Sequence, residues 1–264
     1  MKKFILHTLL LLGVMTSVFA QEKYDIRLNL KKGQTFIYQV TYNTPTMISM
    51  KGQQVEIKQN QTINYTYKVL DVKDGNYLME INIDRMQASS SSMGQEMNID
   101  TDSDAKDEMT TQLRKIVNQK VTLWVDAKFK PIGDNLVENG VPSMLMFPSF
   151  FPEELIAPGE SFTVNEPLFS NENLDTQYEG VVMLVAVSDT DYTFRANGKT
   201  TTTIEGLTAE GMVVEGNGID NIVLDRKTGM IKNTFSTMAL KGTGSIQGAQ
   251  AEISSNTITS VRLL

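Results

Sequence analysis

The chain has 264 residues, with 24 Lys and Arg against 31 Asp and Glu, no Cys and a single His. The net charge of −7 argues against nucleic acid as a partner, because phosphate binding requires clustered lysines and arginines, and the sequence has no such cluster. With 41% hydrophobic and 21% charged residues, the composition is typical of a globular protein with a core.

Residues 1–20 have the features of a secretory signal peptide. Two lysines come first, an apolar stretch follows over 4–14, and small residues occupy positions 18 and 20. We expect cleavage to leave a secreted or periplasmic protein that begins at Gln21 and has no further transmembrane segment. The removed segment contains His7, two lysines and no acid, so the mature protein would lack His and Cys and its net charge would fall to −9.

The lack of His and Cys excludes several kinds of chemistry in the mature protein. It rules out Ser-His-Asp and Cys-His catalysis, zinc or haem sites built on imidazole or thiolate, and disulfides. Carboxylates could still act in pairs, and candidates near strands are Asp126, Glu205, Glu215 and Asp225, but nothing in the sequence marks two of them as a pair. We therefore predict a non-enzymatic protein with no catalytic residue, no cofactor and no metal site.

The first part of the mature chain alternates apolar and polar residues as a half-buried sheet does. Alternating apolar positions over 36–42 predict one strand, and those over 55–69 predict a second, very long and bent strand. Asp74-Gly75 is a hairpin signal, and the return strand covers 77–83. The alternation also fits an outer-membrane barrel, but we prefer a soluble sheet, because covering a core requires the same pattern.

One helix is predicted after these strands. Residues 88–98 mix Ser and Met with little periodicity, which predicts a mobile loop. Apolar residues at helical spacing then predict a helix over 104–118, with Ser103 as its N-cap and acidic residues in its first turn.

The acidic residues before and within this helix resemble a calcium loop in their spacing. They are Asp100, Asp102, Asp104, Asp107 and Glu108. An EF-hand needs a Gly and a bidentate Glu where this chain has Ala105 and Thr111. We therefore interpret the acids as part of a solvent-exposed loop that leads into the helix.

A proline-rich apolar connector over 140–158 divides the rest of the chain. A strand over 121–126 and a return segment over 130–137 precede the connector, and strands over 230–240 and 251–263 lie near the C-terminus. We predict a first β half over 21–139 and a second over 159–264. Similar turn motifs recur in the same order in both halves, which leaves internal duplication and a simple meander as equal alternatives.

These motifs resemble a family of secreted bacterial all-β proteins of unknown function. The resemblance rests on the run over 28–38, on Asp-Gly before Tyr77, and on the Phe-Pro-Glu at 151–153 ahead of the Pro-Gly-Glu-Ser-Phe at 158–162. It implies a β fold over nearly the whole mature chain and brings no known site. In architecture the chain is also similar to the half-barrels of periplasmic lipoprotein carriers and lipid-binding proteins.

The predicted fold is therefore all-β, an antiparallel curved sheet in the form of a half-barrel or of two related β halves, with one short α-helix. Aromatic and methionine side chains are the candidate lining of an apolar site. The candidate ligand-binding residues are Tyr38, Tyr42, Tyr65, Tyr67, Met144, Met146, Phe147, Phe150 and Phe151.

We predict a binding protein for a lipid or other apolar ligand, with an apolar ligand or an envelope protein as its partner. The alternative is a structural or interaction module of the cell envelope without a small-molecule pocket. Tyrosines that only pack in a core, and a connector buried between the halves, would explain the same residues.

Overall fold

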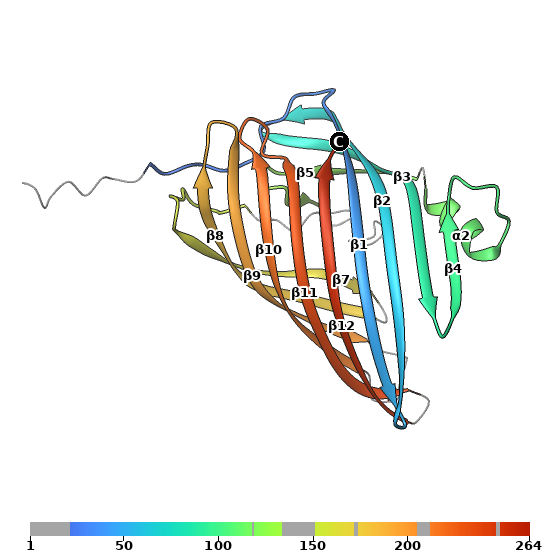
Figure 1. Ribbon diagram of the computed structural model, residues 1–264. Coiled ribbons are helices and arrows are strands. Elements are labelled where there is room, and N and C mark those ends of the chain that lie inside the picture. The colour runs from blue at the N-terminus through green and yellow to red at the C-terminus, as the bar shows by residue number, and fades with distance from the viewer. Residues whose placement is uncertain (1–21, 118, 134–150, 172–173, 205–211, 247–248) are drawn as a thin grey trace, which may run out of the picture.

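The structure is a computed structural model that describes residues 22–117, 119–133, 151–171, 174–204, 212–246 and 249–264. Long strands dominate it, together with one short helix in the described residues (Figure 1). In chain order the elements are β1 (Thr35–Met50), β2 (Gln53–Lys73), β3 (Asn76–Ser92), β4 (Gln95–Asp100), α2 (Glu108–Ile116), β5 (Lys120–Val125), β6 (Pro131–Ile132), β7 (Ser161–Asn171), β8 (Leu174–Val187), β9 (Asp191–Ile204), β10 (Met212–Asp225), β11 (Ile231–Ile246) and β12 (Ala249–Leu263).

All twelve strands of the described residues belong to one open antiparallel sheet. Its order is β6-β5-β3-β2-β1-β12-β11-β10-β9-β8-β7, and β4 pairs with β3 beside this path. The sheet curves strongly, so that it has a concave and a convex face (Figure 1). The all-β prediction is confirmed, and the arrangement is one continuous sheet: β1 of the predicted first half pairs directly with β12 of the second.

Local hairpin turns connect several neighbouring strands. Asp74 and Gly75 have φ angles of 52° and 79°, the combination of a type I′ turn, as the sequence predicted. Met93 and Gly94 form the same kind of turn, with φ angles of 50° and 77°.

The prediction of a mobile loop over 88–98 is wrong. Gln87–Ser92 of β3 pairs residue by residue with Gln95–Asp100 of β4. The serines are half-buried at the side of the sheet, away from a core that would impose hydrophobic alternation. Backbone pairing stabilises this hairpin, and periodicity cannot detect such pairing.

The helix exists, but its predicted start at 104 is wrong. It begins at Glu108, and Asp107 is the N-cap, accepting a hydrogen bond of 2.8 Å from the backbone N–H of Thr110. Ser103 instead donates to the carbonyl of Asp100. Arg114 donates to the carbonyls of the preceding loop at Thr101, Ser103 and Ala105, and these bonds keep residues 101–105 out of the helix.

The hydrophobic core lies on the concave face of the sheet, near one end of its strands, because the N-terminal segment that packs in this core contacts residues beside both free edges of the curved sheet. The N-terminal segment runs across this end and places Ile26, Leu28 and Leu30 in the core. It is held by backbone hydrogen bonds from Leu28 to Ala127 and from Asn29 to Thr228, and by a two-bond bridge between Tyr24 and Ile156. The turns of both predicted halves are therefore tied to the same segment.

Candidate functional site: the concave face of the sheet

The four predicted tyrosines lie on this core face, and they differ in burial. Tyr38 and Tyr67 are fully buried and pack edge to face, with ring centroids 5.5 Å apart. The Tyr38 hydroxyl donates to the carbonyl of Ile231 at 2.8 Å. Tyr65 is buried and its hydroxyl has no partner among the described residues, whereas Tyr42 is half-buried. Tyr38 and Tyr67 thus serve as core, and Tyr42 lies at the border of the core.

Of the predicted residues in the connector, Phe151 is described. It is half-buried and packs against the core cluster. The other four, Met144, Met146, Phe147 and Phe150, lie outside the described residues.

Next to the core, a row of polar side chains crosses the concave face. Asp220 of β10 is the cross-strand partner of Ser236 of β11. Ser236 is also the partner of Thr259 of β12, and Thr259 is the partner of Tyr42 of β1. Directly opposed residues in an antiparallel sheet share a face, so these four side chains form what we name the polar row. Desolvation raises the pKa of Asp220, and a hydrogen bond from Ser236 lowers it in part.

A row of three glycines runs beside the polar row. Gly180, Gly198 and Gly218 are directly paired across β8, β9 and β10. The ring of Tyr178 occupies the space where side chains at Gly180 and Gly198 would lie. Glycine in a strand interior often marks such a close approach, and this signal in the sequence could have indicated the arrangement.

Several hydroxyls on this face are buried without partners among the described residues. They belong to Tyr178, Thr200 and Ser255, whose exposed fractions are 3%, 4% and 8%. Burial raises the pKa of Tyr178 to about 12, with a smaller contribution from the charge of Asp220. An unsatisfied buried hydroxyl costs about 1–3 kcal/mol, so the site gains if a bound group supplies the missing hydrogen bonds.

Beyond these rows the concave face becomes aliphatic again. Ile48 pairs with Val55 on one side and with Ile253 on the other. These three side chains, with Ile57 and Leu240, are half-buried and lie outside the core cluster. We name these five residues the distal patch. The concave face therefore presents an apolar surface, with a polar zone between that surface and the core.

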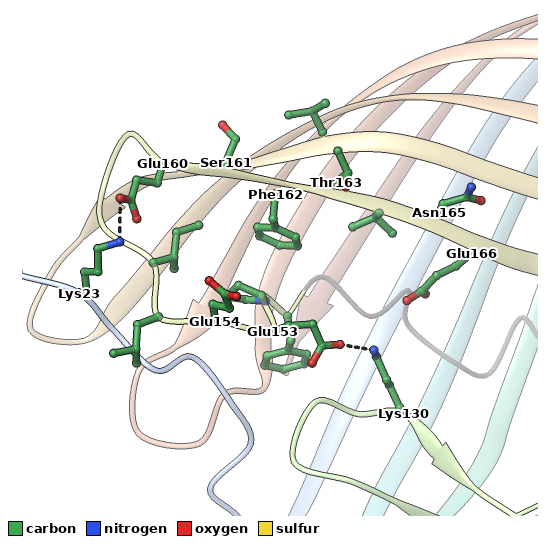
Figure 2. A pocket seen from close by; sticks show the side chains of 16 residues that line it. Lys23, Lys130, Glu153, Glu154, Glu160, Ser161, Phe162, Thr163, Asn165 and Glu166 are labelled. Carbon is green, nitrogen blue, oxygen red and sulfur yellow. Dashed lines mark hydrogen bonds and ion pairs between the residues drawn. The ribbon is translucent and has the colours of Figure 1, made fainter.

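A broad pocket of about 880 Å³ lies at the free edge formed by β7. Phe151, Phe162 and Val164 contribute apolar lining, and charged side chains surround them. Figure 2 shows the ion pairs Lys23–Glu160, at 2.9 Å, and Lys130–Glu153 at its rim. Lys130 immediately precedes β6, so residues next to both free edges of the sheet contribute to this edge pocket.

Several of the acids singled out in the sequence have structural partners, whereas Glu205 lies outside the described residues. Arg85 donates two hydrogen bonds to Asp100, at 3.0 and 2.5 Å, and its hydrogen bonding and charge hold the pKa of this carboxyl well below its usual range. Asp126 and Asp225 accept backbone N–H groups within their own turns. Within the described residues, no group of three or more His, Cys, Asp and Glu side chains could hold a metal ion.

No helix in the described part of the chain is long and apolar enough to cross a membrane. No family model matches the chain, and no curated protein matches it.

Comparison with solved structures finds distant all-β proteins. Lipovitellin is 9% identical with a TM-score of 0.49, and the match covers 89% of this chain and 25% of lipovitellin. The chain thus spans about a quarter of the length of that protein. An outer membrane channel from Pseudomonas putida F1 is 10% identical with a TM-score of 0.32, and the match covers 90% of this chain and 97% of the channel.

Proposed function

We propose that this chain is a non-enzymatic binding protein outside the cytoplasm, and that it holds an elongated apolar ligand, such as a lipid chain, against the concave face of its sheet. The observation that carries the proposal is the distal patch: aliphatic side chains continue along the concave face after the core has ended.

The lengths of the strands support this proposal. β2 has 21 residues, which corresponds to a length of about 70 Å. The residues of β2 that belong to the core cluster lie between Ile63 and Val69. The part of β2 that precedes Ile63 therefore extends beyond the core. A sheet that served only to cover this core would not need that extension.

The two faces of the extension differ in character. On the concave side of β12, Ile253 opposes Ile48, whereas the neighbouring residues Glu252 and Ser254 are exposed on the other side. One apolar face is the pattern of a sheet that contacts an apolar layer. A ligand chain lying along the concave face would be that layer.

The rival proposal is an interaction module of the envelope that uses the edge pocket. The free edge of β7 beside a pocket with a charged rim favours this alternative, because an unpaired strand edge can bind another chain.

Binding of a neutral apolar fluorophore, diphenylhexatriene, tests the proposal with two variants of β12. Ile253→Lys places a charge on the concave face and should weaken binding by roughly tenfold or more, because desolvating a lysine is costly. Ile258→Lys makes the same change on the exposed convex face and should leave binding unchanged.

Thermal melts of both variants check that each is folded. Absence of fluorophore binding to the wild type, or equal losses in the two variants, would reject the concave face as a binding site and favour the interaction module.

A further inference from the structure

We infer that the zone between Asp220 and Tyr178 is a specificity site that receives a positively charged amine group of the ligand. This inference rests on the proposed function and adds the chemical class of the ligand: an amphiphile with an apolar chain and an amine head.

Asp220 provides the charge of this site. Its direct cross-strand neighbours, Ala196 and Ser236, are uncharged, and Ser236 supplies a hydrogen bond. No cation of the described residues contributes to its electrostatic environment, which desolvation dominates. A desolvated carboxylate without a cationic partner is complementary to a cation and repels an anion.

The unpartnered hydroxyls provide the second, independent observation. Tyr178 and Thr200 are direct cross-strand partners, so both side chains project from the same face as Asp220. Both are more than nine-tenths buried, and their hydroxyls have no hydrogen-bond partner among the described residues. Thr200 pairs with Gly216, four residues along β10 from Asp220, so one ammonium group cannot bond both of these residues. The Tyr178 ring extends over Gly198 toward Asp220, so the Tyr178 hydroxyl and the Asp220 carboxylate are the two acceptors offered to the N–H donors of an ammonium group.

Gly218 lies between Asp220 and the ring of Tyr178. It is the concave-facing residue next to Asp220 on β10, and it is the direct partner of Gly198, over which Tyr178 lies. Because Gly198 and Gly218 have no side chains, neither residue places atoms between the Tyr178 hydroxyl and the Asp220 carboxylate. The distal patch continues on the same face, in the direction that the apolar chain of the ligand would take.

Calorimetric titration with decylamine, decanol and decanoate tests the assignment, because the three share one chain and differ in the head group. We expect decylamine to bind at least about tenfold more tightly than decanol, and decanoate to bind more weakly than both, as expected for one desolvated charge pair.

Three variants test which residues cause the tighter binding of decylamine. Asp220→Asn should remove the advantage of decylamine and leave decanol binding within about twofold, since the amide is neutral and of equal size. Glu215→Gln makes the same change on the exposed face of the same strand and should retain the advantage. Tyr178→Phe, which keeps the ring over the glycines, should weaken decylamine binding by roughly fivefold, the effect of one hydrogen bond.

The outcomes separate the two proposals. If decanol binds but decylamine has no advantage, or if Asp220→Asn and Tyr178→Phe both retain it, the amine site is wrong and the apolar binding face stands. If none of the three ligands binds the wild type, the proposed function fails and the amine site with it. Thermal melts establish that each variant is folded before its titration is interpreted.

Discussion

Single tyrosines show how one residue type serves two roles on one face of this sheet. Tyr38 and Tyr77 are buried with their hydroxyls satisfied by the backbone carbonyls of Ile231 and Leu28. Tyr65 and Tyr178 are buried on the same side, but their hydroxyls have no partner among the described residues. A satisfied buried hydroxyl stabilises the fold, whereas an unsatisfied one costs free energy that a new hydrogen bond would recover.

Removing the Tyr38 hydroxyl should therefore reduce stability. Tyr38→Phe leaves the carbonyl of Ile231 without this hydrogen bond in a buried place, which should cost about 1–2 kcal/mol in the free energy of unfolding. Urea denaturation measures the loss. Tyr65→Phe is the matched control and should cost less, because its hydroxyl has no partner to lose; equal losses would contradict this distinction.

The Arg85–Asp100 ion pair should make stability depend on acidity. Because the folded-state pKa of Asp100 lies below its unfolded value near 3.9, the pair stabilises the protein above about pH 4 and loses its effect as the pH falls below that value. The Arg85 side chain is 36% exposed, so solvent screening reduces the contribution of this ion pair to stability.

Thermal melts of the wild type and Asp100→Asn test this dependence. The difference in midpoint should be present at pH 7 and shrink toward pH 3. Asp104→Asn, an exposed acid nearby, is the control and should match the wild type throughout. A difference for Asp100→Asn that is the same at both pH values would show that the ion pair is not its source.

At the scale of elements, the paired glycines determine how closely one side chain can lie on the sheet. Tyr178 covers Gly180 and Gly198, which belong to its own strand and to the next. A β-carbon at Gly198 would collide with the ring, so this packing requires glycine.

Gly198→Ala should consequently destabilise the protein by about 1–3 kcal/mol, the usual cost of overpacking. In a Tyr178→Ala background the same substitution should cost almost nothing, since the colliding ring is gone. Denaturation of the two single variants and the double variant gives the coupling between the sites. Additive effects would mean that the ring does not lie over this glycine.

At the scale of the whole molecule, the pairing of β1 with β12 joins the two predicted halves. Eleven pairs of residues link these strands, from Tyr38 with Leu263 to Met50 with Ala251. The N-terminal segment also binds turns from both halves. The halves therefore share one sheet and one core.

We expect the mature chain to unfold in a single calorimetric transition, because neither half can complete the sheet without the other. The fragments 21–139 and 159–264 should each fail to fold alone, since β1 and β12 would each lose a long partner strand. A fragment that melts cooperatively by itself would contradict this and support two independent domains.

Much of the fold could be predicted from the sequence, because strand periodicity and turn chemistry are local. The alternation over 55–69 predicted the long strand β2, and Asp74-Gly75 predicted its turn, since a type I′ turn requires positive φ at both central residues. Local pattern failed at 88–98, where pairing with a neighbouring strand prevails over an irregular composition.

The candidate site could not be predicted in the same way. Tyr38, Tyr42, Tyr65 and Tyr67 were placed correctly on one face by their spacing, but Tyr178 and Asp220 were not singled out at all. Tyr178 and Asp220 belong to strands separated by β9, and only the register of β8, β9 and β10 places them on one face, on either side of the glycine row. The sequence by itself determined the strands, their apolar faces and their turns, because these depend on near neighbours. The tertiary structure alone decided which polar side chains meet on the concave face, because register joins residues that are far apart in the chain.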